Sequence, residues 1–504
     1  MQKWPDDCID LIYLDPPFKS DTNYNILFGT QNGKPAQLQA FEDTWYWNEK
    51  AHERVENLKG AIAHPAHKPI AGLHLMLGDC GMLAYLSYMA ERLAEMKRLL
   101  KPTGSIYLHC DPSASHYLKT IMDGIFDGRN FRNEIVWKRR ADKHNLATKT
   151  MGPLHDVILW YGDIEEANYN RQYTPYSKDY IDSHYKHKDE RGNYRLLPCT
   201  NESGGNKPYE FRGVNRAWRF SKDRMEDMYD QNLLVQLKPE GPYYYKKYLK
   251  DAEGVPLQDL WDDISPCRGK ESLGYPTQKP RALLERIINA SCPPHGIVFD
   301  PFCGCGTAID AAQRLNRQWL GVDISSFAID LIVKERLQDR SIPVAGIPLD
   351  LTGAKRFAEA DRFGFEKWAI NRVPGFVPNE KQVGDGGIDG RAKLMNKWND
   401  LNLALAQVKS GGLGGLASDA RDFLHVMQRE DAVCGVFITT EKIDGRKRSA
   451  HEEFESMGRF EIGANNYPRV QFWSIEEYFD GRFPNLPPML NPYTGKPMAQ
   501  IHLI

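Results

Sequence analysis

One short stretch near the start of the chain contains residues whose types and spacing could do chemistry. Asp15–Phe18 reads DPPF and directly follows the apolar run Ile9–Leu14. The Asp15 carboxylate and the Pro16 carbonyl are fixed hydrogen-bond acceptors, and the prolines donate no competing N–H. Such acceptors can bind the N–H groups of an exocyclic amine and keep its nitrogen closer to a tetrahedral shape. The ring of Phe18 could stack on a base extruded from a duplex. The stretch therefore predicts amino-group chemistry on a nucleobase.

A second stretch, Phe299–Ala308, reads FDPFCGCGTA and predicts a small-molecule site. Gly304 and Gly306 let the backbone turn sharply and approach a ligand, because neither carries a Cβ. A carboxylate at the end of the next predicted strand suits ribose hydroxyls, and the pattern GxG, shorter than GxGxxG, disfavours a pyrophosphate. These features disfavour a dinucleotide, and the stretch looks like the glycine-rich turn of an S-adenosylmethionine site. The residues that favour a ligand site over a plain strand-to-helix turn are Asp300, Phe302 and Asp323.

Alternating strands and helices must position these two stretches. The predicted strands are Ile9–Leu14, Ser105–His109, Ile297–Phe299 and Trp319–Val322. The predicted helices, from apolar spacing, are Met82–Leu100, Tyr117–Ile125, Arg281–Ala290 and Ala308–Leu315. This alternation predicts an α/β fold with a doubly wound, parallel, Rossmann-like sheet.

The composition limits the class of protein without indicating a function. The chain has 504 residues, of which 41% are hydrophobic and 26% charged, and a formal net charge of −2. Its length predicts several domains, and we expect a soluble globular protein without membrane partners because no apolar run is long enough to span a bilayer. Nine cysteines without framework spacing favour the reducing cytoplasm. With this net charge, any DNA contact must come from local basic patches.

The stretch between the two predicted chemical sites is polar and rich in tyrosine. Residues 161–250 contain 13 of the 24 tyrosines. Basic residues lie beside aromatic ones in Trp137–Arg140, Tyr185–Lys188 and Tyr243–Tyr248, which predicts phosphate contacts next to stacking surfaces. A solvated loop region is the alternative. The candidate DNA-binding residues are Lys138, Arg139 and Arg140.

Cysteine chemistry is disfavoured. Methylation at cytosine carbon 5 needs a cysteine nucleophile. The Pro-Cys pairs Pro198-Cys199 and Pro266-Cys267 both precede the glycine loop, and neither is followed by glutamine. Cys303 and Cys305 lack a second pair that would complete a tetrahedral zinc site.

The C-terminal third carries a further candidate site. Gly384–Gly390 reads GDGGIDG, and the apolar strand Leu401–Val408 leads to Gln407-Val408-Lys409. Asp389 and Gln407 could hold Mg²⁺, and Lys409 could orient or activate water for phosphodiester cleavage. Residues 407 and 409 share one strand face, and Glu366 could support the site. The alternatives are a glycine hairpin before an ordinary strand, or an inactive nuclease fold that binds DNA.

Over roughly residues 1–350 these motifs resemble the beta group of DNA amino-methyltransferases, in which the catalytic half precedes the cofactor half. Further matches are KPTGSIYLHCD (Lys101–Asp111), NEIVWKRR (Asn133–Arg140) and TQKP (Thr277–Pro280). The resemblance implies adenine N6 as the target, because aspartate at the first DPPF position is more typical of adenine enzymes than of cytosine-N4 enzymes. It implies as catalytic residues Asp15, Pro16, Pro17 and Phe18. It implies around S-adenosylmethionine the residues Thr277, Lys279, Asp300, Phe302, Gly304, Gly306 and Asp323. Family members usually carry further residues ahead of the catalytic strand, which suggests a truncated or mis-assigned start.

Over roughly Phe363–Phe479 the chain resembles the Mrr-like restriction nucleases, whose pattern GxDG…QxK is matched by Asp389, Gln407 and Lys409. This resemblance implies a PD-(D/E)xK-type α/β domain.

The sequence thus predicts five regions: a catalytic half (1–139), a target-recognition insert (140–270), a cofactor half (271–350), a nuclease domain (360–480) and a tail (481–504). The favoured hypothesis is a restriction–modification protein that methylates and cuts double-stranded DNA. A homodimer is a possible assembly. Left open are an orphan or cytosine-N4 methyltransferase whose C-terminal domain only binds DNA, and a DNA-binding protein with both sites inactive.

Overall fold

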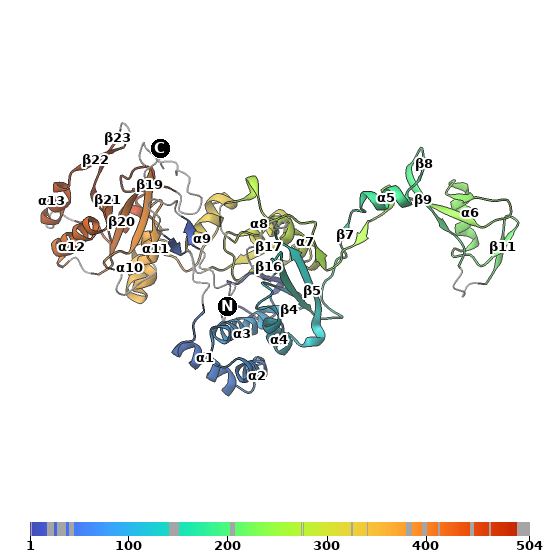
Figure 1. Ribbon diagram of the computed structural model, residues 1–504, viewed down its shortest axis with the longest axis horizontal. Helices are drawn as coiled ribbons and strands as arrows, with labels where there is room; N and C mark the ends of the chain where they lie inside the picture. The colour runs from blue at the N-terminus through green and yellow to red at the C-terminus, as the bar shows by residue number, and fades with distance from the viewer. Residues whose placement is uncertain are drawn as a thin grey trace. The chain divides into compact units, whose positions relative to one another are not determined.

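The computed structural model describes residues 1, 3–17, 25–27, 37–39, 45–140, 151–201, 207–273, 275, 277–323, 326–339, 341–379, 386–395, 401–411, 414–443, 448–462 and 465–490. They form two compact units (Figure 1). The larger unit combines Met1–Tyr169 with Asp259–Ile504, and the smaller unit is Asn170–Gln258. Phe18, which the sequence predicts to stack on the target base, lies outside the described residues.

A seven-stranded sheet in the order β15-β5-β6-β4-β1-β16-β17 organises the larger unit. The strands are β1 (Ile9–Leu14), β4 (Leu100–Cys110), β5 (Phe131–Lys138), β6 (His155–Gly162), β15 (Leu260–Trp261), β16 (Ile297–Asp300) and β17 (Gln318–Gly321). The sheet is mixed, because β6 runs antiparallel to both β4 and β5, whereas β4, β1, β16 and β17 are mutually parallel. The prediction of a wholly parallel sheet is therefore wrong at β6, which is antiparallel to both of its neighbours.

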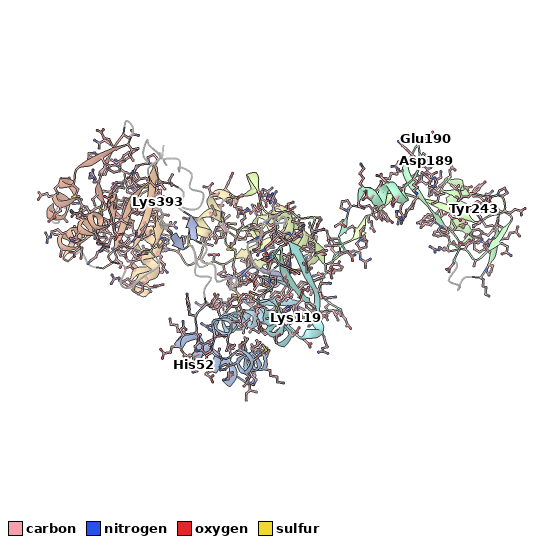
Figure 2. All side chains as sticks on the ribbon, viewed as in Figure 1. His52, Lys119, Asp189, Glu190, Tyr243 and Lys393 are labelled. Carbon is pink, nitrogen blue, oxygen red and sulfur yellow. The ribbon has the colours of Figure 1, made fainter. Side chains whose placement is uncertain are left out.

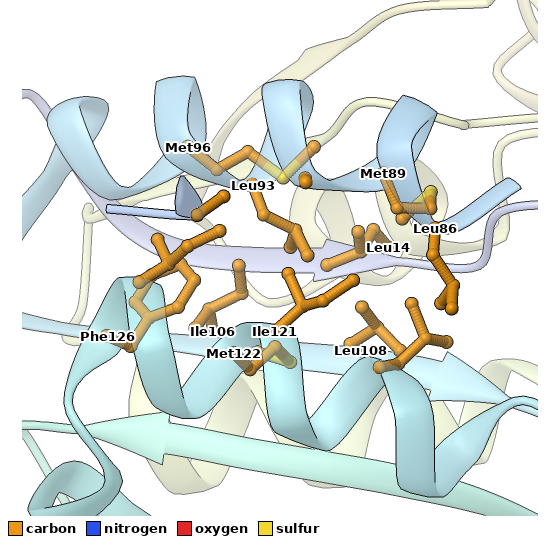
Figure 3. Packing of buried hydrophobic residues seen from close by; sticks show 14 of the residues in the cluster. Leu14, Leu86, Met89, Leu93, Met96, Ile106, Leu108, Ile121, Met122 and Phe126 are labelled. Atoms are coloured by element: carbon orange, nitrogen blue, oxygen red, sulfur yellow. The ribbon is translucent and has the colours of Figure 1, made fainter. Parts of the chain in front are cut away.

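The core beside β1 explains why these residues form a central strand. All six residues of β1 are buried, as expected of a parallel strand covered on both faces. Apolar side chains from β1 and β4 pack against the helices α3 (Gly81–Leu99) and α4 (Ser115–Phe126), as Figure 3 shows. These two helices confirm the predicted Met82–Leu100 and Tyr117–Ile125 within two residues at each end. The packing fixes the strand that carries Asp15.

The remaining elements of this part of the unit are mostly short. They are α1 (Glu49–Gly60), α2 (His67–Leu77), η1 (Gly128–Asn130), η3 (Gly269–Glu271), α7 (Arg281–Ser291), α8 (Thr307–Arg314), α9 (Ser326–Leu331), the π-helix η4 (Ile332–Arg336) and the two-stranded pair β2 (Asn25–Leu27) and β3 (Gln37–Gln39). The helices α7 and α8 confirm the two helices predicted to flank the strand before the glycine loop.

The smaller unit contains a four-stranded antiparallel sheet in the order β12-β13-β9-β8. Its elements are β7 (Tyr173–Thr174), α5 (Lys178–His184), β8 (His187–Asp189), β9 (Gly192–Pro198), β10 (Tyr209–Phe211), β11 (Val214–Arg216), α6 (Lys222–Asp230), β12 (Leu234–Gln236), β13 (Tyr243–Tyr248), η2 (Leu249–Asp251) and β14 (Val255–Pro256). Phe211, Trp218 and Tyr243 are central in its core, and Figure 2 labels Tyr243. The unit covers a shorter stretch of sequence than the predicted insert 140–270, because β6 and β15 belong to the seven-stranded sheet.

A five-stranded sheet in the order β18-β19-β20-β21-β24 forms the C-terminal part of the larger unit. Its strands are β18 (Val377–Pro378), β19 (Gly390–Met395), β20 (Leu401–Lys409), β21 (Ala432–Thr439) and β24 (Val470–Ser474), beside the hairpin β22 (Arg459–Ile462) and β23 (Asn465–Pro468). The helices here are α10 (Leu351–Ala360), α11 (Arg362–Ile370), α12 (Leu416–Arg429), α13 (Arg448–Ser456) and α14 (Ile475–Phe479). Separate hydrophobic clusters on the two faces bury Ala404, Ala406 and Val408 in one and Leu405 in the other. Alternation along β20 therefore places Gln407 and Lys409 on the face of Leu405, toward α12.

In the described part of the chain, no helix is both long and apolar enough to cross a membrane.

Candidate active site at the edge of the seven-stranded sheet

The two stretches singled out by the sequence meet at one edge of the sheet. Strands β1 and β16 pair in parallel, with Leu11 opposite Val298 and Ile12 opposite Phe299. Their carboxyl ends therefore deliver Asp15 and the glycine loop to the same edge. The chain continues from β1 to β4 on one side and from β16 to β17 on the other. Such a divergence point is where open α/β sheets hold their ligands.

The acidic corner is partly enclosed and in contact with a lysine. The Asp15 side chain is 17% exposed and that of Lys279 is 11% exposed, and Lys279 Nζ donates to Asp15 Oδ2 in an ion pair. Pro16 is buried and Pro17 is half-buried. Lys279 belongs to the TQKP motif, for which the resemblance implied cofactor binding. The structure instead brings its ammonium group to the predicted catalytic carboxylate.

A second carboxylate is buried beside this pair. Asp300 ends β16, is 4% exposed and accepts a hydrogen bond from the Phe302 amide at 3.1 Å. Burial raises the pKa of Asp300 well above its usual range, against the opposing hydrogen bond from Phe302. The negative charges of Asp15 and Asp323 raise it further, whereas Lys279 lowers it. Asp300 therefore holds its proton to a higher pH than an ordinary carboxyl, and when protonated it can donate a hydrogen bond.

The glycine loop has the conformation that its sequence predicts. Gly304 has φ +47° and Gly306 has φ +75°, values that side chains rarely adopt. A Cβ on Gly306 would lie 2.6 Å from Ile332 Cγ1, and one on Gly304 would lie 3.3 Å from the ring of Tyr275. Asp323 Oδ2 accepts a hydrogen bond from the Gly304 amide at 2.8 Å. Asp323 thus shapes the loop itself, a contact that its predicted role toward a ribose did not include.

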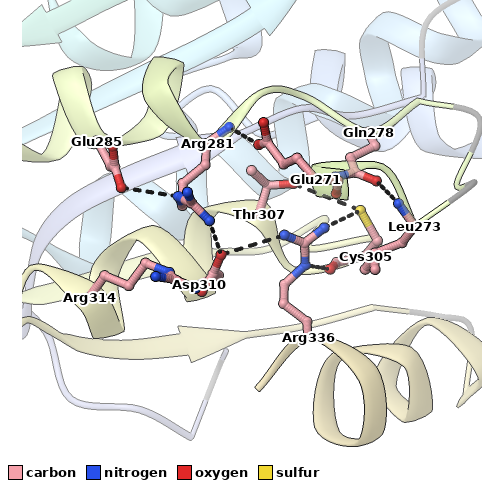
Figure 4. Close-up of polar contacts among 10 residues, drawn as sticks. All are labelled: Glu271, Leu273, Gln278, Arg281, Glu285, Cys305, Thr307, Asp310, Arg314 and Arg336. Carbon is pink, nitrogen blue, oxygen red and sulfur yellow. Dashed lines mark hydrogen bonds and ion pairs between the residues drawn. The ribbon is translucent and has the colours of Figure 1, made fainter. Parts of the chain in front are cut away.

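Ion pairs behind the loop connect it to the TQKP segment (Figure 4). Arg336 Nε donates to the Cys305 carbonyl, and its Nη2 lies 3.4 Å from Cys305 Sγ. The buried Asp310 lies between Arg336 and Arg281, at 3.7 and 3.5 Å from their Nη1 atoms. Gln278 donates to the Glu271 carbonyl at 2.7 Å and accepts from the Leu273 amide at 2.8 Å, which fixes the turn that begins at Thr277.

Sequence reasoning missed these supporting residues. Asp310 carried one weak signal, its i,i+4 spacing to Arg314 on α8, which the structure shows as an ion pair at 2.8 Å. Arg336 and Tyr275 reach the loop only through the tertiary fold, so no local pattern indicated them.

The predicted DNA-binding residues have different surroundings. Arg140 is exposed, and Lys138 is half-buried at the end of β5. Arg139 Nε instead lies 2.9 Å from the buried Asp156 Oδ1. Contact of these residues with DNA stays a prediction.

Aromatic residues that neighbour the basic residues were expected to stack on bases, but most of these aromatic residues are buried. They are Trp137, Tyr185, Tyr243 and Tyr248, each at most 7% exposed. Their rings build local cores, as where Trp137 Nε1 donates to the Ile264 carbonyl at 3.0 Å. The prediction of stacking surfaces at these four positions is therefore wrong. Small domains fill their cores with aromatic rings, so the number of aromatic residues in a segment does not show that they face a ligand.

The C-terminal candidate residues come together on neighbouring strands. Asp389 precedes β19, and its Oδ2 accepts from the Val408 amide at 2.7 Å, between Gln407 and Lys409 on β20. Gln407 Oε1 is buried and has no hydrogen-bond partner among the described residues. Lys409 Nζ lies 2.7 Å from Asp419 Oδ2. An orphaned amide oxygen beside a carboxylate suits Mg²⁺, which takes a few protein oxygens and completes its shell with water and phosphate.

Two findings limit the C-terminal prediction. No group of three or more His, Cys, Asp and Glu side chains suited to a metal occurs in the described ranges. Glu366 pairs with Arg362 at 2.9 Å, and its helix α11 packs in the cluster of Ala404 and Val408, on the face opposite to Gln407. The structure therefore does not bring Glu366 to the candidate site.

Comparison with known proteins assigns the family. Residues 9–334 match the model of the N6/N4 DNA methylase family. This match covers well over half of the chain, so the chain belongs to that family. The matched range contains the seven-stranded sheet, the smaller unit and the site at the ends of β1 and β16.

Individual relatives match only in part. The type II methyltransferase M.EcaI of Enterobacter cloacae is 29% identical over 259 residues, which cover 50% of this chain and 57% of the relative. The Mod subunit of the type III restriction-modification enzyme StyLTI of Salmonella typhimurium is 27% identical over 332 residues, covering 62% and 47%. The chain thus spans about half the length of these curated relatives. A solved M1.HpyAVI–SAM complex has 16% identity and a TM-score of 0.29, covering 66% of this chain and 90% of that one. At that TM-score the likeness identifies neither a fold nor a ligand for this chain.

Proposed function

We propose that the protein is a DNA methyltransferase that moves the methyl group of S-adenosylmethionine to adenine N6 of an extruded base in double-stranded DNA. The observation that carries this proposal is the parallel pairing of β1 with β16, which brings the Asp15 corner and the glycine loop to one edge. Family membership supports the same chemistry. The aspartate at the first DPPF position favours adenine over cytosine N4.

The residues present fit the cofactor. Gly304 and Gly306 have left-handed φ values that form the tight turn of the loop, and a carboxylate, Asp323, accepts from the Gly304 amide. When bound, S-adenosylmethionine supplies an electrophilic methyl group on sulfur. Gly304, Gly306, Asp323 and Phe302 would hold it, with Thr277 on the neighbouring turn.

The chain's own residues then position the amine. The Asp15 carboxylate and the Pro16 carbonyl accept hydrogen bonds from the amino group, so its lone pair points toward the methyl group. The neighbouring Lys279 ammonium forms an ion pair with Asp15 and so limits the positions that this carboxylate can take. Catalysis here consists of positioning and fixed electrostatics, without a covalent enzyme intermediate.

Methyl transfer from labelled S-adenosylmethionine to unmethylated DNA tests the proposal. We expect incorporation by the wild-type protein and by Asp127→Asn, an exposed carboxylate after α4, and none by Asp15→Ala. Chromatography of the hydrolysed DNA should recover N6-methyladenine. Recovery of N4-methylcytosine would overturn the adenine assignment, and equal incorporation by Asp15→Ala would overturn the site.

We also propose DNA contact by the smaller unit. Asn170–Gln258 carries 16 Lys and Arg against 13 Asp and Glu, whereas the whole chain has a formal net charge of −2. Exposed basic side chains such as Lys186, Lys188 and Arg216 suit phosphates. A variant that replaces these three by Ala should lose DNA affinity with a weaker salt dependence, and it should keep affinity for S-adenosylmethionine.

A second candidate function is metal-dependent DNA cleavage by the C-terminal part, which would make the chain a restriction–modification protein. It rests on the Asp389 carboxylate, which accepts from the amide of Val408, the residue between Gln407 and Lys409, and on the buried Gln407 oxygen, which is unpartnered among the described residues. Nicking of unmethylated plasmid with Mg²⁺ should be lost with EDTA and with Lys409→Ala, and kept with Lys355→Ala, an exposed lysine of α10. Intact plasmid after incubation with the wild-type protein would leave a DNA-binding role.

A further inference from the structure

A fully buried chain of polar side chains runs beneath the acidic corner. Tyr13, on β1, is 2% exposed, and its hydroxyl lies 2.9 Å from Nδ1 of His109 on β4. His109 is 0% exposed, and its Nε2 lies 3.1 Å from Oδ2 of Asp156 on β6. Arg139 Nε lies 2.9 Å from the other Asp156 oxygen, and its side chain is 22% exposed. The chain thus begins two residues before Asp15 and ends at a partly exposed cation.

The charge of Asp156 sets the direction of its hydrogen bond with His109. Burial works to raise the pKa of Asp156, but the hydrogen bond from His109 and the positive charges of Lys279 and Arg139 outweigh it and hold this pKa below the usual value. Asp156 is therefore an ionised acceptor, so His109 donates from Nε2. Burial and the nearby Asp15, Asp300 and Asp156 raise the pKa of Tyr13 well above 10. The Tyr13 hydroxyl stays protonated, so it can donate to Nδ1 or accept from it, as the tautomer of His109 requires.

The two prolines limit how the backbone directly after Asp15 can be held. Pro16 and Pro17 have no N–H groups, so no backbone donor fixes the chain directly after Asp15. Tyr13 and Asp15 lie two residues apart and project to the same side of the strand. A hydrogen bond that fixes the Tyr13 side chain therefore also limits rotation of the segment that carries the Asp15 carboxylate.

We propose that Tyr13, His109 and Asp156 are positioning residues for methyl transfer, and that they hold the end of β1 so that Asp15 meets the amine in a reactive geometry. This inference rests on the proposed methyltransferase activity. Positioning errors of about 1 Å can lower a rate by about two orders of magnitude. The loss should appear in kcat, because these residues touch neither substrate.

A matched pair of tyrosines separates positioning from general packing. Tyr107 is the neighbour of Tyr13 across β1 and β4, is also 2% exposed, and its hydroxyl lies 2.6 Å from Ser291 Oγ. Tyr107→Phe therefore removes an equally buried hydroxyl whose partner is a serine. The partner of the Tyr13 hydroxyl is instead a histidine that pairs with a carboxylate. Tyr13→Phe should lower kcat at least about tenfold, while Tyr107→Phe should keep it within about twofold. The KM values for S-adenosylmethionine and DNA should stay within about twofold for both.

Two further measurements test the same inference. Hydrogen exchange of the peptide spanning 9–17 should be faster in Tyr13→Phe than in Tyr107→Phe, a readout that needs no activity. His109→Gln, which keeps a donor and an acceptor, should retain more kcat than His109→Leu. These variants also serve if Tyr13→Phe folds poorly.

The outcomes separate this inference from the proposed function. Active wild-type protein together with an undiminished kcat in Tyr13→Phe would overturn the positioning role alone. Equal losses in Tyr13→Phe and Tyr107→Phe would overturn it as well, since packing would then explain both. Wild-type protein that transfers no methyl group would overturn the proposed function and this inference together.

Discussion

Lys279 forms an ion pair with Asp15 across 264 positions of sequence. The pair joins the TQKP turn before α7 to the end of β1, so one contact connects the catalytic half to the cofactor half. The position of the lysine changes its expected role. A lysine that only held the cofactor would affect binding, whereas we expect one that contacts the proposed catalytic Asp15 to affect the chemical step.

Lys279→Met should lower kcat at least about tenfold, with a smaller effect on the KM for S-adenosylmethionine. Without the ammonium group, the negative charge of Asp15 faces the buried Asp300 uncompensated. Single-turnover methyl transfer measures the effect, and the control is Lys119→Met, which removes a half-buried lysine that pairs with Asp123 on α4. An increase in the KM for S-adenosylmethionine at unchanged kcat would instead indicate that Lys279 serves cofactor binding.

Gly306→Ala should abolish tight binding of S-adenosylmethionine and lower stability by about 1–3 kcal/mol. The reasons are the left-handed φ of +75° and the 2.6 Å approach of the new Cβ to Ile332. Calorimetric titration and thermal unfolding measure the two effects. Gly72→Ala, in α2 with no atom near the added Cβ, should be neutral or slightly stabilising. Equal behaviour of the two variants would contradict the conformation of the loop.

The raised pKa of Asp300 predicts a specific pH dependence of stability. The unfolded carboxyl has a pKa of about 3.9, so above that pH the folded protein keeps a proton that the unfolded chain releases. The contribution of Asp300 is therefore complete below about pH 4 and is lost as the pH rises toward the folded value. Asp300→Asn, which keeps the acceptor for Phe302, should lack this loss. Its melting temperature relative to wild type should rise between about pH 4 and pH 7; a constant difference would argue against a protonated Asp300.

Asp10→Ala should destabilise the protein by about 2 kcal/mol. Asp10 is 5% exposed, accepts from the Ile297 amide at 2.9 Å and binds Lys101 through both oxygens. The substitution leaves the amide and the ammonium unpaired where β1 meets β16. Denaturant unfolding measures the loss, with Asp79→Ala, an exposed partner of His74, expected to change stability by less than about 0.5 kcal/mol. Similar values for both would show that Asp10 does not join the strands.

The sequence was informative where local patterns carry the structure. The apolar run Ile9–Leu14 predicted β1 to the residue, and helical spacing predicted α3 and α4, because each element buries one continuous apolar surface. The direction of β6 was not predictable. Its residues, HDVILWYG, suit a buried strand of either orientation, and only the pairing with β4 decides.

The site divides along the same line. Asp15, Gly304 and Gly306 could be singled out because a proline corner and left-handed turns need particular residue types, and their roles in the site stay predictions. The contacts of Lys279 with Asp15 and of His109 with Asp156 join segments far apart in the chain. No local pattern specifies such pairs. The buried tyrosines show the converse error, since residue type alone does not distinguish a core ring from an exposed one.

The smaller unit leaves the seven-stranded sheet after β6 and returns at β15, and these strands flank β5. Neither β1 nor β16 takes part in this excursion. Changes within this segment would therefore alter the proposed DNA contacts and leave in place the two strands that carry the candidate active site.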